Sequence, residues 1–294
     1  MKQLLSKFFW YILNHTYKWW PDSVWLRIIY QQKLHRKLNL RSPRRFTEKL
    51  QWLKLHDRNT LYPLLVDKGE VKNYISNKFG AEYVIPTYGI WDSFDQIAFE
   101  RLPDQFVLKC THDSGRVFIC KDKRNFDKLQ AKEVLEKSLK HNFFWWTREW
   151  PYKKVKGRIL AEQYLDDAGT QSDGLTDYKF YCFNGKVEYC QVIKDRSSHE
   201  TIDFYDAEWN HQDFIGLNIN ASHSLSPVCK PRCYAKMLEI ASSLSEGIPF
   251  VRIDLYEVDD KVKFGEVTFY PASGLGSFMP DEYDFILGEK ITVI

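Results

Sequence analysis

The feature that most constrains the fold of this chain is a pair of alternating segments separated by an Asp-Asp step. Residues 251–255 read VRIDL, and residues 264–268 read FGEVT. Alternate side chains of a strand share one face, so a hairpin of these two segments brings Asp254 and Glu266 together on one side. The other side of the first strand is apolar. The two segments therefore predict a hairpin with one buried face and one face that carries two carboxylates.

The charged face of this hairpin has the residue types of a cation site. Two neighbouring carboxylates repel each other unless a cation lies between them, and oxygen ligands suit Mg²⁺ held against phosphate. Arg252 shares the face of Asp254 and would bind phosphoryl or carboxylate oxygens through two parallel hydrogen bonds. The alternative is an exposed ladder of alternating charges on an amphipathic hairpin, without a function.

A second segment suited to phosphate binding lies earlier in the chain. An apolar strand at 106–110 carries Lys109, a loop with Ser114 and Gly115 follows, and the chain returns as a strand at 117–121. Backbone N–H groups of such a flap would cover phosphates, while Lys109 supplies a positive charge. The segment lacks the spacing of a P-loop. The alternative is an ordinary hairpin, because many hairpins contain a lysine and a glycine.

A third segment, the apolar strand at 159–165, contains Glu162 and precedes Asp166 and Asp167. A strand that runs into a loop offers the backbone N–H, the carbonyl and the apolar slot that a purine needs. The alternative is an ordinary core strand followed by an exposed acidic turn.

The remaining periodicity predicts an α+β chain whose modules share one cleft. Asn184-Gly185, between two alternating runs, is a strong hairpin signal. The expected domains are a helical, basic and aromatic extension (1–60), a linking α/β part (61–105), a flap-bearing subdomain (106–157) and a C-terminal subdomain with the metal site (158–294). Further helices are expected at 67–79 and 231–247, and further strands at 83–88, 178–183, 187–193, 250–258 and 262–269.

The first sixty residues are strongly basic. They hold 13 Lys and Arg against three Asp and Glu, a net charge of +10, and five of the ten tryptophans, whereas the rest of the chain has 29 basic and 36 acidic residues. Such a segment suits an anionic partner such as lipid head groups or a polyanionic glycan. Nucleic acid is not expected, because no recognised binding motif accompanies the charge. The alternative is a set of helices that pack their aromatics on the main domain.

Composition and motifs disfavour several classes of protein. No apolar run reaches the ~18 residues of a membrane-spanning helix, and no signal peptide is recognisable. A cytoplasmic location is expected, with peripheral contact at the inner membrane face through residues 1–60. The six cysteines form no C-x-x-C pair, which argues against a disulfide framework and a zinc finger.

Several longer segments resemble one protein family. "VDKGEVKNYI", "LPDQFVLKCTHDSG", "DYKFYCFNGKV" and "PFVRIDLYEVDDKVKFGEVTFYPASG" are similar to the TupA-like (teichuronopeptide biosynthesis) branch of the ATP-grasp superfamily. The resemblance covers roughly residue 46 onward. It implies an ATP-grasp fold with an N-terminal helical extension, and ATP and Mg²⁺ as cofactors. Proteins of this family occur in gene clusters for capsule and cell-surface polysaccharides.

The resemblance also implies roles for individual residues. Two lysines from different subdomains would touch the nucleotide phosphates. Lys68 matches the first of them, with Lys72, one helical turn later, as the alternative, and Lys109 matches the second. Ser114 and Gly115 belong to the flap. The adenine and ribose contacts that the resemblance implies are the hinge acid Glu162, the backbone of Leu165 and the carboxylate of Asp167 or Asp166.

The same resemblance assigns the metal site to the hairpin. Asp254 and Glu266 match the magnesium-binding acids, and Arg252 matches the arginine that steadies the acyl phosphate; Arg252 and Lys109 are thus the expected catalytic residues. Thr268 stands where the superfamily usually has asparagine. A threonine hydroxyl still binds magnesium but reaches less far.

The activity implied is an ATP-dependent carboxylate–amine ligase that works through an acyl phosphate. Its expected partners are ATP, an amine donor and an anionic glycan or lipid-linked sugar acceptor, for example a uronic acid that receives an amino acid. One alternative is a glycosyltransferase of surface polysaccharide synthesis, although the Asp-x-Asp signature of many such enzymes is absent from the sequence. Another is a non-catalytic protein that binds glycan or membrane.

Overall fold

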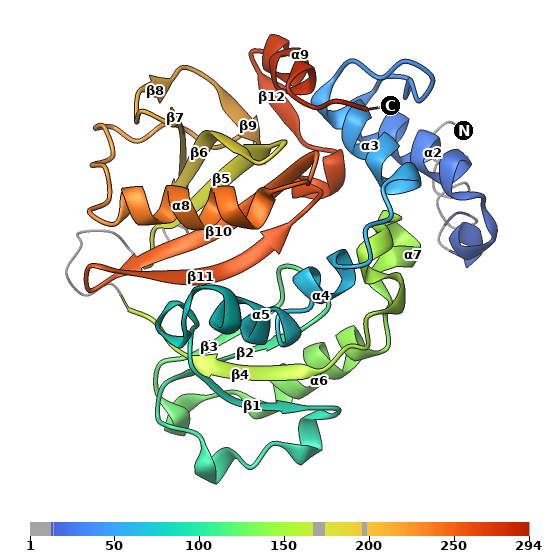
Figure 1. Ribbon diagram of the computed structural model, residues 1–294. Helices are drawn as coiled ribbons and strands as arrows, with labels where there is room; N and C mark the ends of the chain where they lie inside the picture. Colours follow the sequence, from blue (N-terminus) through green and yellow to red (C-terminus); the bar gives the residue numbers. More distant parts are fainter. Residues whose placement is uncertain (1–12, 14, 167–173, 196–198, 294) are drawn as a thin grey trace.

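Two antiparallel sheets, one above the other in Figure 1, form the body of the protein, and short helices connect them at one side. The computed structural model describes residues 13, 15–166, 174–195 and 199–293. The upper sheet has the strand order β11-β10-β5-β6-β7-β8, and the lower has the order β1-β4-β2-β3. This arrangement of mixed helices and two sheets agrees with the expected α+β class.

The six-stranded sheet is built from the C-terminal half of the chain. Its strands are β5 (Asp177–Phe183), β6 (Lys186–Lys194), β7 (Thr201–Asp206), β8 (His211–Gln212), β10 (Phe250–Val258) and β11 (Lys261–Thr268). Asn184 and Gly185 join β5 to β6 with φ values of 50° and 85°, as the predicted Asn-Gly turn requires. Asp259 and Asp260, at 51° and 58°, turn the chain between β10 and β11 in the same way.

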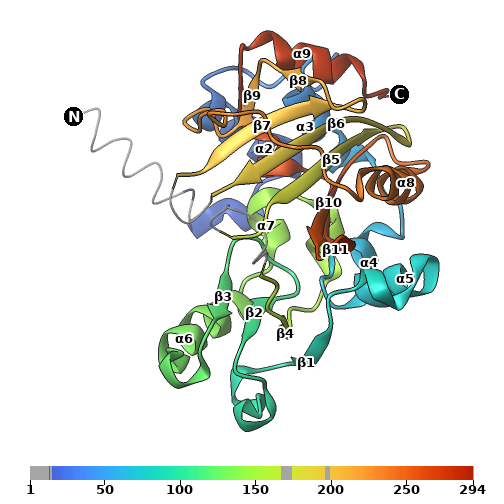
Figure 2. The ribbon, with the colours of Figure 1, turned by 90° about the vertical axis from the view of Figure 1, so that its left-hand side faces the viewer.

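Helices cover both faces of this sheet (Figure 2). On one face lies α8 (Tyr234–Ser245); on the other lie α3 (Phe46–His56) and α9 (Glu282–Glu289). The ring of Phe46 packs edge-on against that of Phe250, with centroids 4.8 Å apart, and Tyr283 stacks on Phe214 at 4.0 Å. A small two-stranded sheet, β9 (Ile215–Leu217) with β12 (Ser277–Met279), connects the α9 region to the sheet. The α3 segment is therefore part of the main core.

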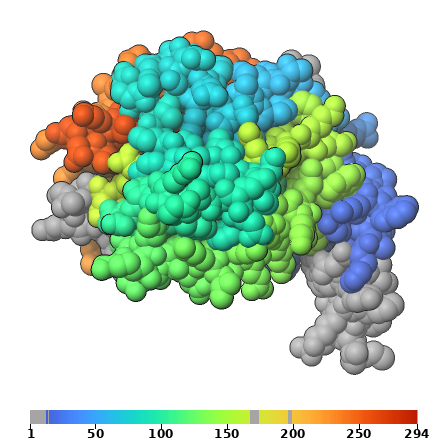
Figure 3. Space-filling view, turned by 90° about the horizontal axis from the view of Figure 1, so that it is seen from below, coloured from blue at the N-terminus to red at the C-terminus, as the bar shows by residue number. Residues whose placement is uncertain are grey.

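The four-stranded sheet carries the segment predicted as a flap. Its strands are β1 (Thr87–Trp91), β2 (Phe106–Cys110), β3 (Val117–Cys120) and β4 (Ile159–Gln163), and α6 (Lys128–Leu139) packs on it around a second apolar cluster. From below, this part of the chain forms most of the visible surface (Figure 3).

The strand expected at 83–88 is wrong in its position. Residues Ala81–Tyr83 form a 3₁₀ helix, and β1 begins only at Thr87. Val84 instead makes a parallel bridge with Phe264 of the upper sheet, and Pro86 has no N–H with which to continue a ladder. This short segment therefore joins the two sheets instead of belonging to one of them.

The remaining helices connect the two sheets or precede them. They are α2 (Asp22–Leu34), α4 (Tyr62–Val66), α5 (Glu70–Phe79) and α7 (Phe143–Thr147), with 3₁₀ helices at Tyr17–Trp19, Phe94–Gln96, Phe99–Arg101, Lys123–Asn125, Trp150–Lys154 and Pro271–Gly274. Among the described residues, no helix has the length and apolar character needed to cross a membrane.

The packing alternative for the basic N-terminal segment holds for part of it. Trp25 is fully buried, and its Nε1 donates to the carbonyl of Trp146 at 2.8 Å. Arg148, only 1% exposed, pairs with Asp22 at 2.8 Å and so docks α2 on α7. Trp19, by contrast, is 86% exposed. Residues 1–12 and 14 of this segment lie outside the described residues.

Candidate active site

The β10–β11 hairpin brings two acids together as its sequence predicts. Asp254 lies directly opposite Glu266, and Arg252 lies opposite Thr268. The Arg252 guanidinium lies between them: its Nη2 donates to Glu266 Oε1 at 3.3 Å and to Thr268 Oγ1 at 3.1 Å. Asp254 is 1% exposed and Arg252 is 9% exposed. An exposed charge ladder is therefore excluded for these two residues, because the charged face is covered as well.

A further cation, Lys179, belongs to this site and was not predicted. Lys179 lies on β5 directly opposite Asp254, and its Nζ donates to Asp254 Oδ2 and, at 3.2 Å, to Asp177 Oδ1. It is 5% exposed. The sequence signal was a lysine inside an otherwise apolar strand, with an acid two residues earlier on the same face.

Lys68 approaches Glu266 from the link between α4 and α5. Its Nζ lies 3.6 Å from Glu266 Oε2 and donates to the carbonyl of Asp113 in the β2–β3 turn. Burial opposes the ionisation of Glu266, but the charges of Lys68 and Arg252 outweigh burial and lower its pKa to about 2. Glu266 is thus a carboxylate at any physiological pH, although a third of its side chain is exposed.

The two rival lysines occupy different places. Lys72 donates to Glu162 Oε2 at 2.8 Å, to the Ile85 carbonyl at 2.8 Å and to Thr87 Oγ1 at 3.0 Å. Lys109 pairs with the other oxygen, Glu162 Oε1. Burial favours the neutral acid, yet the two lysines keep the pKa of Glu162 below its usual value, while burial lowers the pKa of Lys72. Lys68 thus pairs with Glu266 of the hairpin, whereas Lys72 pairs with Glu162 of β4.

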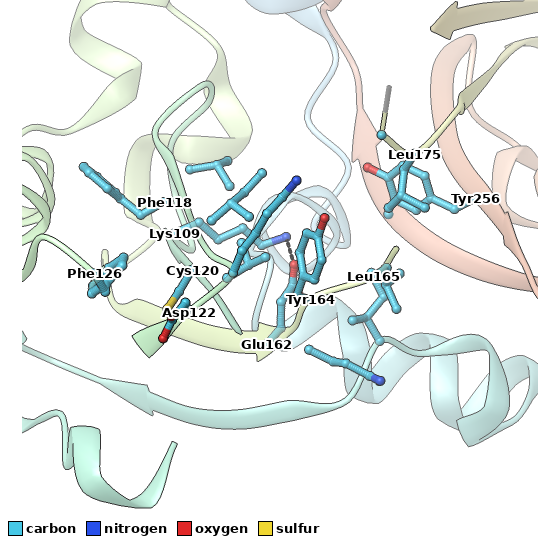
Figure 4. Close-up of a pocket in the computed structure, with 18 of the residues that line it drawn as sticks. Lys109, Phe118, Cys120, Asp122, Phe126, Glu162, Tyr164, Leu165, Leu175 and Tyr256 are labelled. Carbon is cyan, nitrogen blue, oxygen red and sulfur yellow. Dashed lines mark ion pairs between the residues drawn. The ribbon is translucent and has the colours of Figure 1, made fainter. Parts of the chain in front are cut away.

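A cavity of about 820 Å³ lies between the two sheets, in the size range of small-molecule sites. Its walls come from β2, β3 and β4 on one side and from Tyr256 and Gly265 of the hairpin on the other (Figure 4). The lining mixes apolar side chains, such as Phe118, Phe126 and Leu165, with charged ones, such as Lys109, Asp122 and Glu162. The lining residues used below are Lys109, Glu162, Leu165, Asp177, Tyr256 and Gly265.

The predicted nucleotide residues fall into three groups by position. Lys109, Glu162 and Leu165 line the cavity. Ser114 and Gly115 lie at the exposed β2–β3 turn and, like Lys68 and Lys72, are not among the lining residues. Asp167 lies outside the described residues, and Asp166 is exposed. The nucleotide roles of all these residues stay predictions.

A bulge at Gly265 shapes the cavity wall. The register between β10 and β11 shifts by one residue beside Asp254, so that Gly265 is the extra residue of β11. A Cβ at Gly265 would lie 2.8 Å from the Tyr256 ring and 3.0 Å from the Asp254 carbonyl. Only glycine leaves the Tyr256 ring in its place against the cavity.

The side chains at the hairpin fit the magnesium ion that the family resemblance implies. Asp254, Glu266 and Thr268 offer oxygen atoms alone, which is the donor set that Mg²⁺ prefers. Arg252 and Lys179 both donate to Asp254 and balance its negative charge. A bound Mg²⁺ would share this role with them. The donor chemistry therefore suits Mg²⁺ and gives no reason to expect a softer metal here.

Comparison with solved structures finds distant likenesses. A D-alanine–D-alanine ligase from Bacillus anthracis in complex with ATP is 13% identical, covering 70% of this chain and 54% of that chain, with a TM-score of 0.40. The corresponding ligase from Helicobacter pylori is 13% identical over 84% and 69%, with a TM-score of 0.41. A RimK-domain ATP-grasp protein from Sphaerobacter thermophilus DSM 20745 is 12% identical over 78% and 67%, with a TM-score of 0.39.

The chain thus spans little more than half the length of the first of these ligases, and likenesses of this kind assign no substrate. A comparison with curated proteins gave no match. The model of one family, described as TupA-like ATPgrasp, matches residues 48–292. That segment contains both sheets, the cavity and the β10–β11 hairpin. The chain therefore belongs to the TupA-like ATPgrasp family.

Proposed function

We propose that the protein is an ATP-dependent carboxylate–amine ligase that forms an amide through an acyl phosphate. One observation carries this proposal: Asp254 and Glu266 lie opposite each other on the hairpin, and three cations contact these acids. The cations are Arg252, Lys179 and Lys68. Positive charge gathered around two fixed carboxylates, beside a cavity between two sheets, suits a triphosphate and its counterion.

The cavity offers both apolar lining for a base and a lysine for phosphates. The apolar wall near Leu165 would take the base, and Lys109 would reach toward the phosphates. Glu162 would hold Lys72 and Lys109 in place, because both its oxygens are occupied by these lysines. Lys68 and Arg252 would face the γ-phosphate near Glu266.

The chemistry follows from the charges. An oxygen of the substrate carboxylate attacks the γ-phosphorus, the bond to ADP breaks, and an acyl phosphate forms. The substrate amine then attacks the acyl carbon, loses a proton and expels inorganic phosphate. Lys68, Lys109 and Arg252 would balance the charge on the transferred group and on the tetrahedral oxygen. Asp254, Glu266 and Thr268 would hold Mg²⁺, which supplies further positive charge to the phosphate oxygens when bound.

The acceptor that we propose is an anionic surface polysaccharide or its lipid-linked precursor, for example a uronic acid that receives an amino acid. Two observations support this class of acceptor. The chain resembles a family of proteins that occur in capsule gene clusters, and its first sixty residues have a net charge of +10, which suits an anionic partner. The exposed Trp19 would allow peripheral contact at the inner membrane face, where lipid-linked sugars are assembled.

The test is the release of ADP and phosphate when the protein meets ATP, Mg²⁺, a uronic acid and an amino acid, with hydroxylamine added in parallel to trap an acyl phosphate as a hydroxamate. Glu266→Gln should abolish both signals, whereas Glu282→Gln, at an exposed position of α9, should leave both unchanged. Release of UDP from a UDP-sugar with ATP ignored would instead support a glycosyltransferase, and no reaction with any nucleotide would support a binding protein.

A further inference from the structure

A cluster of two histidines and one aspartate lies at the edge of the upper sheet, away from the active site. Asp203 comes from β7, His211 from β8, and His223 from the loop that follows β9. His211 Nε2 lies 3.0 Å and His223 Nδ1 lies 3.1 Å from the same atom, Asp203 Oδ1. One ligand atom from each residue therefore converges within 4.8 Å of the others. The three residues come from separate chain segments and form no sequence motif.

This cluster and the active site lie on opposite faces of the sheet. Cross-strand partners share a face, and the pairs Asp254–Lys179, Lys179–Gln191 and Gln191–Phe204 run from β10 across the sheet to β7. Asp203 precedes Phe204, so it faces the other way, toward the side of α8. In Figure 1, β7 and β8 lie at the far edge of the sheet from β11. The cluster is therefore not a part of the nucleotide site.

We propose that Asp203, His211 and His223 form a zinc site. Imidazole nitrogen and carboxylate oxygen are zinc ligands, and three protein ligands with one open position are a common zinc arrangement. Ligands 2.0–2.1 Å from a tetrahedral zinc stand about 3.3 Å apart. The two N–O separations of 3.0 and 3.1 Å are within a few tenths of an ångström of that spacing. Small shifts would admit the ion.

The partners of the ligands support the same assignment. The second oxygen of the carboxylate, Asp203 Oδ2, accepts from the Ser224 hydroxyl at 2.5 Å and from the Ser224 N–H at 3.2 Å. These bonds fix the carboxylate and leave Oδ1 aimed at the histidines. On the other side, the free ring nitrogen of His211, Nδ1, lies 3.6 Å from Asp213 Oδ1. A ligand carboxylate held by hydrogen bonds is the usual arrangement at a zinc ion, and the exposed Asp213, beyond hydrogen-bond distance, adds a negative charge beside His211.

Access and burial are also suitable. Asp203 has 3% of its side chain exposed, whereas His211 and His223 have 35% and 34% exposed. An ion can thus enter from solvent and meet a carboxylate that is already desolvated. His223 Nδ1 also lies 3.1 Å from the Ile202 carbonyl, so binding exchanges that hydrogen bond for a metal bond. The ion would connect β7, β8 and the loop after β9.

The experiment uses the full chain, freed of metal with a chelator and titrated with ZnCl₂ by calorimetry, and with CoCl₂ for its visible absorption. We expect one equivalent of bound metal and a higher melting temperature. His223→Ala and His211→Ala should each weaken this binding more than about 100-fold, because loss of an outer partner alone costs about 10- to 100-fold. Ser224→Ala, which removes such an outer partner, should weaken binding by about 10-fold.

The matched control is His199→Ala. His199 is exposed, lies near the same loop and bonds Ser222, but is not a member of the cluster. Its variant should bind zinc as the unchanged protein does. A double variant, Asp254→Asn with Glu266→Gln, should also keep this binding, because the active-site acids take no part in it. The proposal is overturned if the unchanged protein binds no zinc, or if the His211 and His223 variants bind it as well as the His199 variant, in which case the cluster is only a hydrogen-bonded network around a buried aspartate.

Discussion

Arg252 holds Asp254 through two parallel hydrogen bonds, from Nε to Oδ1 at 2.7 Å and from Nη2 to Oδ2 at 2.8 Å. Lysine cannot make this two-point contact. We expect Arg252→Lys to lower kcat of the proposed ligase at least about 100-fold, as removal of one transition-state donor does. The measurement is steady-state ADP release. Arg232→Lys is the control, because Arg232 pairs with Asp260 at 2.8 Å on the exposed tip of the same hairpin and should leave kcat unchanged.

Glu162 is expected to stabilise the fold because it neutralises two lysines. Glu162→Gln would leave Lys72 and Lys109 facing each other with no counter-charge, which should lower the free energy of unfolding by about 3 kcal/mol. Urea denaturation measures this loss. Glu188→Gln is the comparison: Glu188 also pairs with two lysines but nearer to solvent, so its loss should stay below about 1 kcal/mol. Equal losses in the two variants would contradict the argument.

Glu266 predicts a pH dependence of stability. Its pKa is lowered to about 2 in the folded protein, so its ionised form stabilises the fold above the ordinary glutamate pKa, and this contribution disappears as the pH falls toward 2. The free energy of unfolding of Glu266→Gln should therefore lie below that of the unchanged protein at neutral pH, by on the order of 1 kcal/mol given solvent screening. The difference should shrink at about pH 3. A difference that is constant with pH would argue against the ion pairs of this carboxylate.

Gly265→Ala should impair nucleotide binding without removing any charge. The new Cβ would meet the Tyr256 ring at 2.8 Å and move it at the cavity wall. We expect a higher KM for ATP, and weaker binding of a non-hydrolysable ATP analogue, with little change in melting temperature. Gly247→Ala is the control, because an added Cβ at Gly247 has no neighbouring atom within 4 Å; the φ of 71° at Gly247 makes this variant a test of backbone strain away from the cavity, which should leave KM unchanged. An unchanged KM in Gly265→Ala would contradict our placement of the nucleotide.

The buried side chains of Lys54 and Glu149, linked through Ser273, offer a further electrostatic prediction. Lys54 Nζ donates to the Ser273 hydroxyl at 2.8 Å, and that hydroxyl donates to Glu149 Oε1 at 2.8 Å. Burial raises the pKa of Glu149 to about 7 and lowers that of Lys54 to about 8. Lys54→Met removes the cation, so the pKa of Glu149 should rise further and the protein should lose about 3 kcal/mol of stability at about pH 8. The loss should be smaller at about pH 5, where Glu149 takes up a proton. Adding Glu149→Gln should restore part of it.

The hairpin could be predicted from the sequence because its two strands are neighbours along the chain and a short turn joins them. Alternation over residues 250–258 and 261–268 assigns Asp254 and Glu266 to one face, and the Asp-Asp step supplies the turn. Membership of the TupA-like ATPgrasp family, suspected from several segments, is confirmed. Lys68 and Lys72 could not be separated from the sequence, since both lie near the start of α5 and only the packing decides which acid each one meets.

The parts that escaped prediction depend on contacts between distant segments. Lys179 is one residue in a strand that otherwise looks like core, and its role depends on the pairing of β5 with β10, which no local pattern gives. The zinc cluster depends likewise on three segments, and β7 and β8 were not predicted. The strand expected at 83–88 overlaps β1 only at Thr87 and Tyr88, because the backbone of Val84 pairs with the distant Phe264 of the other sheet.

The long sequence separation between α3 and its partners has a consequence for synthesis of the chain. Thr47 bonds Asp284, a residue made 237 positions later, through both its backbone N–H and its hydroxyl. At about 5–20 residues per second, ribosomes need roughly 12 to 50 s to cover that interval. For most of this time, until β10 and β11 have been made, Phe46 has no finished sheet on which to pack, and a basic aromatic segment stays open to chaperones and to anionic surfaces. Variants that slow elongation between these two positions should therefore raise aggregation in cells without altering the stability of the finished protein.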